Sequence, residues 1–69
     1  MNYRAQIAYD SNKTFKTCQP TFSSEGEALS YAELLAERQI SISNYRVVPV
    51  TDKPTHIFCG GRAVAVTIG

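Results

Sequence analysis

The sequence has 69 residues, with seven Lys and Arg against six Asp and Glu and a formal net charge of +1. A chain of this length predicts one small domain, residues 1–69, and such domains bury only about 60% of the surface that the unfolded chain exposes. The balanced charge supplies no strong field for attracting nucleic acid or an acidic membrane. Hydrophobic residues at 43% and charged residues at 19% exclude a charge-rich disordered chain.

The N-terminal residues and the cysteines bear on the compartment. Arg4, Gln6 and Asp10 interrupt the first ten residues, which therefore lack the apolar block of a signal peptide. No apolar run is long enough to span a bilayer, so we expect a cytoplasmic protein. The two cysteines, Cys18 and Cys59, are too few for a disulfide framework and lack the paired spacing of a zinc site, which predicts two free thiols.

The first two predicted elements form a β-hairpin. Residues 3–9 alternate between apolar and polar side chains, as in a strand with one buried face. The apolar positions are Tyr3, Ala5, Ile7 and Tyr9. Residues 10–13 have turn chemistry, because Asp and Asn side chains bond to their own backbone. Residues 14–18 predict a returning antiparallel strand, which Pro20 is expected to end because proline lacks the N–H group of a ladder hydrogen bond.

A helix is predicted to follow. Residues 24–27 match a capping box, in which the Ser24 hydroxyl accepts from the Glu27 amide and the Glu27 carboxylate accepts from the Ser24 amide. Apolar residues then recur at helical spacing and predict one amphipathic helix with one buried face. The buried positions are Ala28, Leu29, Ala32, Leu35, Ala36 and, at the C-terminal end, Ile40.

Three more strands are predicted after the helix. Residues 45–50 are rich in β-branched side chains, and Pro49 restricts this strand to an edge or a bulge. Residues 55–59 and 62–67 flank a glycine pair at 60–61 that fits a two-residue hairpin turn. The order β-β-α-β-β-β predicts an α+β fold, an antiparallel sheet of about five strands with one amphipathic helix packed on one face.

Residues that could support catalysis are few. His56 is the only histidine, and it stands three positions from Cys59 on one predicted strand, so the two side chains leave from opposite faces. Glu33 and Glu37 lie on the solvated side of the helix, where nothing raises the pKa of a general acid. A strand pattern, not a helix, follows the glycines at 60–61, unlike a phosphate-binding loop. No catalytic residue, metal site or cofactor is predicted.

One class of partner that fits a partly uncovered sheet is nucleic acid. Aromatic side chains on the open face would stack on bases, and basic side chains around them would contact phosphates. The basic candidates are Arg4, Lys13, Lys16, Arg46 and Arg62. This interpretation predicts that these residues converge on one sheet face beside the aromatic rings.

The other class of partner is protein. One helix covers only part of a five-stranded sheet, so apolar residues on the opposite face would stay exposed in a monomer. Candidates for this face are Val48, Val50, Val64 and Val66. A second candidate surface is the helix flank, formed by Tyr31, Leu34 and Arg38 outside the predicted buried arc, because Tyr and Arg are enriched at interfaces. The simpler alternative is that Tyr31 folds over the sheet edge.

These observations predict a small non-enzymatic module that acts stoichiometrically on a protein partner, including a second copy of itself. Nucleic-acid binding through an exposed sheet face is the alternative. The length and the predicted topology are similar to those of small proteins of bacteria and their mobile elements, some of which inhibit larger complexes stoichiometrically. No motif in the sequence identifies a family.

Overall fold

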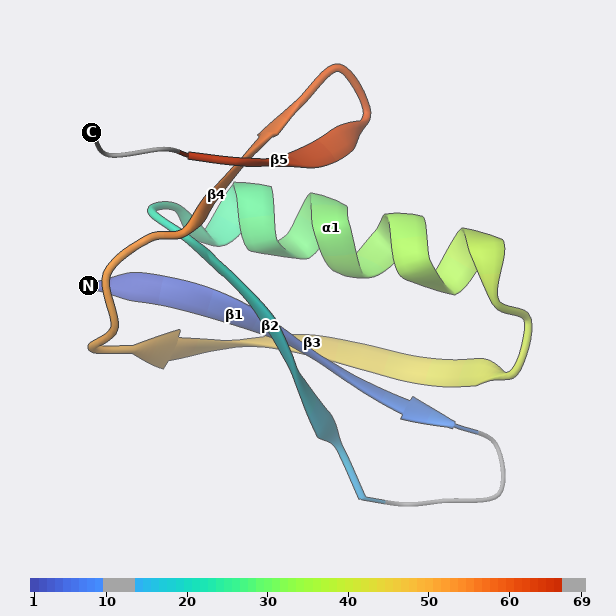
Figure 1. Ribbon diagram of the computed structural model, residues 1–69. Coiled ribbons are helices and arrows are strands. Elements are labelled where there is room, and N and C mark those ends of the chain that lie inside the picture. Colours follow the sequence, from blue (N-terminus) through green and yellow to red (C-terminus); the bar gives the residue numbers. More distant parts are fainter. Residues whose placement is uncertain (10–13, 67–69) are drawn as a thin grey trace.

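The described part of the chain contains five strands, which are divided between a three-stranded sheet and a separate hairpin. The computed structural model describes residues 1–9 and 14–66. Its elements are β1 (Asn2–Tyr9), β2 (Lys16–Phe22), α1 (Glu25–Arg38), β3 (Ile42–Val50), β4 (His56–Cys59) and β5 (Arg62–Ala65). The α+β class with antiparallel pairing is confirmed: α1 lies on one side of the β1–β3 sheet, and the β4–β5 hairpin lies beside α1 (Figure 1).

The prediction of one five-stranded sheet is wrong, because the strands form sheets of three and two in the orders β2-β1-β3 and β4-β5. Just before β4, Thr55 is hydrogen-bonded to Thr21 of β2. Beyond this point β4 and β2 are not paired. Phe58 of β4 donates its backbone N–H to the Glu27 carboxylate at 3.0 Å. The Phe58 N–H is therefore bonded to the first turn of α1 and is not available to a neighbouring strand of the three-stranded sheet. Strand β4 pairs with β5 alone.

The central strand β1 shows the predicted alternation as far as Ile7, after which Ala8 is buried as well. Ala5 and Ile7 are buried and point toward α1, whereas Arg4 and Gln6 point to the outer face of the sheet. On one side β1 pairs with β2 and on the other with β3, both antiparallel. The predicted turn at 10–13 lies outside the described residues.

Strand β2 does not end before Pro20 as predicted but continues to Phe22. Its register on β1 shifts between Gln6↔Thr17 and Arg4↔Thr21, so four residues of β2 span two of β1. Pro20 lies within this irregular stretch at the edge of the sheet, where its missing N–H removes no regular ladder bond. The strand also begins later than predicted, at Lys16.

Strand β3 begins at Ile42, three residues before the predicted start, because the Ile42 side chain is buried in the core. The prediction that Pro49 lies on an edge strand is confirmed by the order of the sheet.

Helix α1 begins as predicted, with the Ser24 hydroxyl accepting from the Glu27 amide at 3.2 Å. The returning bond differs, because Glu27 accepts from the Ser24 hydroxyl at 3.0 Å and from the Phe58 amide. The buried arc is narrower than predicted and centres on Ala28 and Ala32. Leu29 is 40% exposed, and Ile40 is 94% exposed because the helix ends at Arg38. Both predictions of burial are wrong.

Phe22 is the largest side chain that is fully buried. Its ring packs on Tyr31 of α1 with centroids 5.5 Å apart and on His56 of β4 at 6.3 Å. The alanines of α1 and β1 have no side chain beyond Cβ, so the helix approaches the sheet closely. Among the described residues, the buried apolar ones are Ala5, Ile7, Ala8, Phe22, Ala28, Ala32 and Ile42.

The β4–β5 hairpin closes through the glycine pair, as predicted. Gly60 and Gly61 have φ values of 62° and 77°, the left-handed conformation that both central residues of a type I′ turn require. Strand β5 ends at Ala65, and Thr67, the predicted last residue, lies outside the described part of the chain.

Candidate interaction surfaces

The outer face of the hairpin carries three exposed aliphatic side chains. Ile57 lies opposite Val64 in the antiparallel register. Val66, one residue past the end of β5, continues the pairing through its amide bond to the Thr55 carbonyl and lies two positions from Val64, on the same face. Their exposed fractions are 45% for Ile57, 37% for Val64 and 40% for Val66. We call these three residues the hairpin patch. Val64 and Val66, predicted as exposed on the uncovered sheet face, are thus exposed on the hairpin instead.

The inner face of the hairpin attaches it to the rest of the molecule. His56 contacts the Phe22 ring, and Phe58 is half-buried beside the first turn of α1. Thr55 donates its amide to the Thr21 carbonyl at 2.9 Å and accepts from the Thr21 amide through its hydroxyl at 3.0 Å. These contacts orient the hairpin so that the patch faces away from the core.

The helix flank of Tyr31, Leu34 and Arg38 follows one line of α1, because residues three and four apart share a face. Arg38 is exposed, and Leu34 and Tyr31 are half-buried. Burial raises the pKa of the Tyr31 hydroxyl, and the nearby Cys18 thiol raises it further. Tyr31 packs on the Phe22 ring of β2 with centroids 5.5 Å apart, which agrees with the simpler of the two predicted arrangements.

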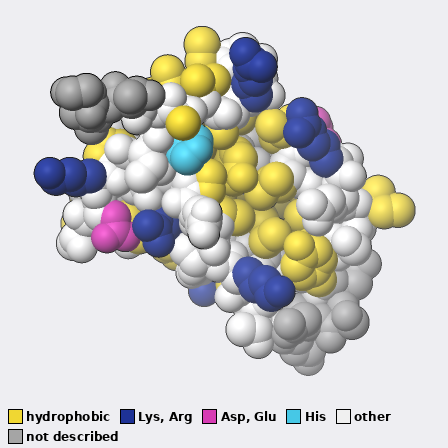
Figure 2. Space-filling view, viewed as in Figure 1, with side chains coloured by type: hydrophobic (Ala, Val, Ile, Leu, Met, Phe, Trp, Pro, Cys, Tyr) yellow, Lys and Arg dark blue, Asp and Glu magenta, His cyan; other side chains and the backbone are white. Residues whose placement is uncertain are grey.

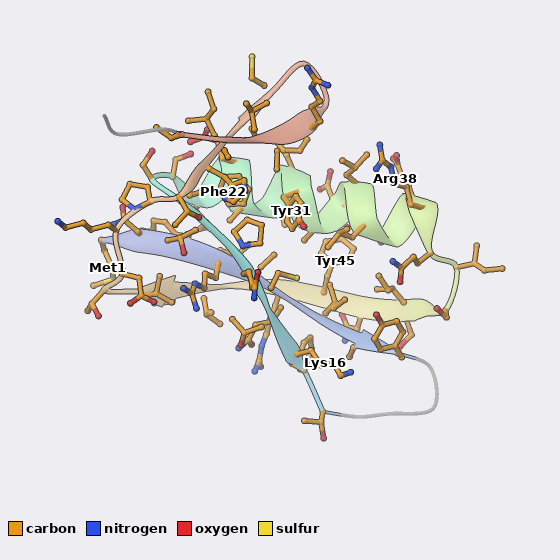
Figure 3. The ribbon with its side chains drawn as sticks, viewed as in Figure 1. Met1, Lys16, Phe22, Tyr31, Arg38 and Tyr45 are labelled. Carbon is orange, nitrogen blue, oxygen red and sulfur yellow. The ribbon has the colours of Figure 1, made fainter. Side chains whose placement is uncertain are left out.

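Figure 2 shows a hydrophobic area in the middle of the visible face, with Lys and Arg side chains spaced around it. In Figure 3, Tyr31 and Tyr45 lie in the middle of the same view, Tyr31 over α1 and Tyr45 between α1 and the three-stranded sheet. Lys16 and Arg38 lie at opposite margins of that region. Both tyrosines are half-buried, so this area exposes the edge of the core and not isolated rings.

The outer face of the three-stranded sheet is polar. Arg4 donates to the Thr21 hydroxyl at 2.8 Å and forms an ion pair with Asp52 at 3.1 Å. Gln6 donates to Thr17 at 3.0 Å and accepts from the Arg46 guanidinium at 2.7 Å. The half-buried Val48 and Val50 lie beside these groups, opposite Arg4 and Asn2. The predicted valine surface on this face is therefore interrupted by hydrogen-bonded polar side chains.

The five basic residues considered for nucleic acid do not converge. Arg4 and Arg46 share the outer sheet face, where Arg46 lies 4.0 Å above the Phe15 ring. Lys16 is opposite Ile7, on the side of the sheet that α1 occupies, with its ammonium 5.9 Å from the Tyr9 ring. Arg62 belongs to the hairpin, and Lys13 lies outside the described residues.

Groups suited to catalysis are also separated. His56 and Cys59 lie on opposite faces of β4, as their spacing predicts, and His56 Nδ1 is 2.8 Å from the Thr55 hydroxyl. Burial raises the pKa of the Cys18 thiol, which weakens it as a nucleophile. Across residues 1–9 and 14–66, we find no pocket and no group of three metal-binding side chains. None of the helices in that part is long and apolar enough to cross a bilayer.

Sequence reasoning missed the second role of Glu27. The capping-box pattern identified this residue as part of the helix start, but its Oε1 also accepts from Phe58, 31 positions later. Only the fold brings Phe58 to the helix terminus.

No protein-family model matches the chain, and no curated protein or solved structure matches it either.

Proposed function

We propose that this chain is a small non-enzymatic module that binds another protein stoichiometrically through the hairpin patch. The observation that supports the proposal is the adjacent exposure of Ile57, Val64 and Val66 on one face of the hairpin. Single exposed aliphatic residues are common, but contiguous ones on a small domain are typical of contact surfaces. Burying them against a partner removes apolar area from water at about 25 cal/mol per Å².

The helix flank contributes less to this proposal than the sequence suggests. Tyr31 is already packed against Phe22, so a partner would gain only the remaining part of its surface. Leu34 and Arg38 remain available at the rim, where contacts contribute less than those at the centre of an interface.

Nucleic-acid binding is the second candidate, and the Arg46–Phe15 contact on the polar outer face favours it. The other basic residues give this candidate little support. The Arg4 charge is paired with Asp52, and Lys16 and Arg62 lie on other surfaces. Among the described residues, a single-stranded nucleic acid would therefore meet one guanidinium on this face that is not paired with a carboxylate. This predicts weak binding with a shallow salt dependence, because the salt dependence grows with the number of phosphates that are neutralised.

The proposal is tested with three immobilised forms of the chain exposed to lysate of the native host. The wild type and Glu33→Lys, a change on the exposed side of α1, are expected to retain the same protein. Val64→Lys is expected to lose it while keeping the same circular dichroism spectrum. Retention of single-stranded nucleic acid by all three forms, with no protein that depends on Val64, would refute the proposal in favour of the second candidate.

A further inference from the structure

We propose that β5 is a self-pairing edge, at which two copies of this chain join antiparallel and their hairpins form one four-stranded sheet. The inference rests on the proposed function, because it names a second copy of the chain as one protein partner. It concerns the backbone edge of β5, whereas the proposed function concerns the side chains on the outer face of the hairpin.

The backbone of β5 has one edge that is not used within the hairpin. Val66 donates its N–H to the Thr55 carbonyl at 2.9 Å and therefore faces β4. Residues two apart in an antiparallel strand share this direction, so Val64 and Arg62 also face β4. Ala63 and Ala65 then direct both N–H and C=O to the opposite edge. Within residues 1–9 and 14–66, no strand pairs with that edge.

The other strand edges are protected in ways that β5 is not. The free edge of β2 carries Lys16, Pro20 and the irregular stretch of its register, and that of β3 carries Pro49. The outer edge of β4 donates its Phe58 amide to Glu27. Lysine, proline and bulges are the devices that keep sheet edges from pairing. Strand β5 contains no lysine, proline or bulge. It is short, its one charged residue is Arg62 at the first position, and Ala65 in it is exposed.

The direction of these backbone groups determines the register of the pairing. In an antiparallel pair, the residues that exchange hydrogen bonds are those whose backbone groups face the partner. Of the two-fold registers that meet this condition, the one with Ala63 of one copy opposite Ala65 of the other pairs both alanines of each copy, so it forms the most hydrogen bonds within β5. Val64 then lies opposite its own equivalent in the close, non-hydrogen-bonded position, with Cα atoms about 4.5 Å apart.

This register is compatible with the side chains that it brings together. Arg62 of one copy lies opposite Val66 of the other, so the two arginines do not face each other and no like charges are paired. The alanines on the inner side are small enough to admit a neighbouring strand beside α1. Two hairpin patches become continuous across the new sheet, and a hairpin that is marginal as two strands gains two more.

The short edge sets the expected strength of the dimer. Only four hydrogen bonds cross the two-fold axis, and an interface of this size lies at the small end of protein contacts, which predicts a weak dimer that dissociates on dilution.

The register is tested by directed disulfide formation. Val64→Cys is placed in a background of Cys18→Ser and Cys59→Ala, so that the new thiol is the only one. Oxidation of this variant is expected to give a covalent dimer, because Cα atoms about 4.5 Å apart fit a disulfide. The matched control is Ile57→Cys in the same background. Ile57 occupies the same face one strand further from the axis. Two copies of it would be separated by three strand spacings, about 14 Å, so this variant is expected to form no covalent dimer. Equal cross-linking of both variants, or of neither, would overturn the proposal.

A second measurement separates this inference from the proposed function. Ala65→Pro removes an outward N–H that the hairpin does not use, and it leaves the patch side chains in place. Sedimentation equilibrium is expected to show a dimer dissociation constant raised about tenfold or more, while retention of a host protein is unchanged. A monomeric wild type that still binds a protein through Val64 would refute the edge pairing alone. A wild type that forms the dimer but retains no host protein that depends on Val64 would refute the proposed function alone.

Discussion

The three-stranded sheet with α1 and the β4–β5 hairpin are built on different principles. Every buried apolar residue among those described belongs to β1, β2, β3 or α1, and the hairpin contains none. The hairpin is instead held by backbone and side-chain hydrogen bonds at Thr21 and Glu27 and by the contact of His56 with the Phe22 ring. A region that does not depend on its own core can carry exposed aliphatic side chains, because their exposure does not compete with packing in the helix–sheet layer.

The largest expected effect follows from truncating the side chain at the junction of the two regions. Phe22→Ala is expected to lower the free energy of unfolding by about 3–5 kcal/mol, since it removes a fully buried ring and leaves a cavity. The half-buried Phe58 provides the control in the hairpin, where Phe58→Ala is expected to cost about 1 kcal/mol. Urea unfolding measures both values. Equal losses would show that the hairpin belongs to the same packed core as the sheet.

The next effect concerns the carboxylate that links α1 to β4. Glu27→Ala removes the acceptor of the Phe58 amide and one partner of Ser24, at an expected cost of about 1.5 kcal/mol. Hydrogen exchange is the informative measurement. The Phe58 amide is expected to exchange faster, and the Ile7 amide in the central strand to change little. Glu27→Gln keeps an oxygen acceptor, so its Phe58 amide is expected to exchange at a rate between those of the wild type and Glu27→Ala.

If the Glu27 change accelerated exchange equally at Phe58 and Ile7, the hairpin and the sheet would open as one cooperative unit. The two regions would then differ in how deeply their side chains are buried but not in their local stability.

A smaller effect is expected at the helix start alone. Ser24→Ala removes the hydroxyl that accepts from the Glu27 amide, at an expected cost of about 1 kcal/mol. Ser23→Ala is the matched control, because its hydroxyl makes only a long contact of 3.5 Å with Glu27. An unchanged urea midpoint for Ser24→Ala would contradict the assigned cap.

The smallest effects are expected from the two thiols, which lie in different regions. Cys59 is exposed in the hairpin, whereas Cys18 is half-buried against Tyr31 and its pKa is raised by burial. We therefore expect iodoacetamide to modify Cys59 several-fold faster than Cys18 at neutral pH. A Cys18→Ser, Cys59→Ala variant is expected to keep the fold, and faster modification at Cys18 would contradict the packing of Tyr31 over β2.

The same burial has a consequence for alkaline stability. Because folding raises the pKa values of Cys18 and Tyr31, the folded state holds their protons more tightly than the unfolded chain. Their contribution is complete below the ordinary pKa of a thiol, about 8.5, and is lost as pH rises through the raised values. Urea midpoints are therefore expected to fall above about pH 9, and to fall less in Cys18→Ser.

Short-range signals predicted much of the secondary structure correctly. The alternation in β1, the Ser24 cap of α1 and the glycine pair at 60–61 each depend on neighbours within a few residues, and each is found in the structure. These features follow from local backbone energetics, so no knowledge of distant contacts was needed. The exposure of Val64 and Val66 was also expected, but from a five-stranded sheet that the structure does not contain, and the two side chains are exposed on the separate hairpin.

Long-range contacts decided the rest. The division of the strands into three and two depends on Glu27 reaching Phe58, and the continuation of β2 through Pro20 depends on its irregular register with β1. The burial of Tyr31 depends on Phe22 of another element. Periodicity shows that a residue has an apolar side, but which side is covered is determined by the partner element. The sequence alone therefore determined the local elements, and the tertiary structure decided which surfaces remain for a partner.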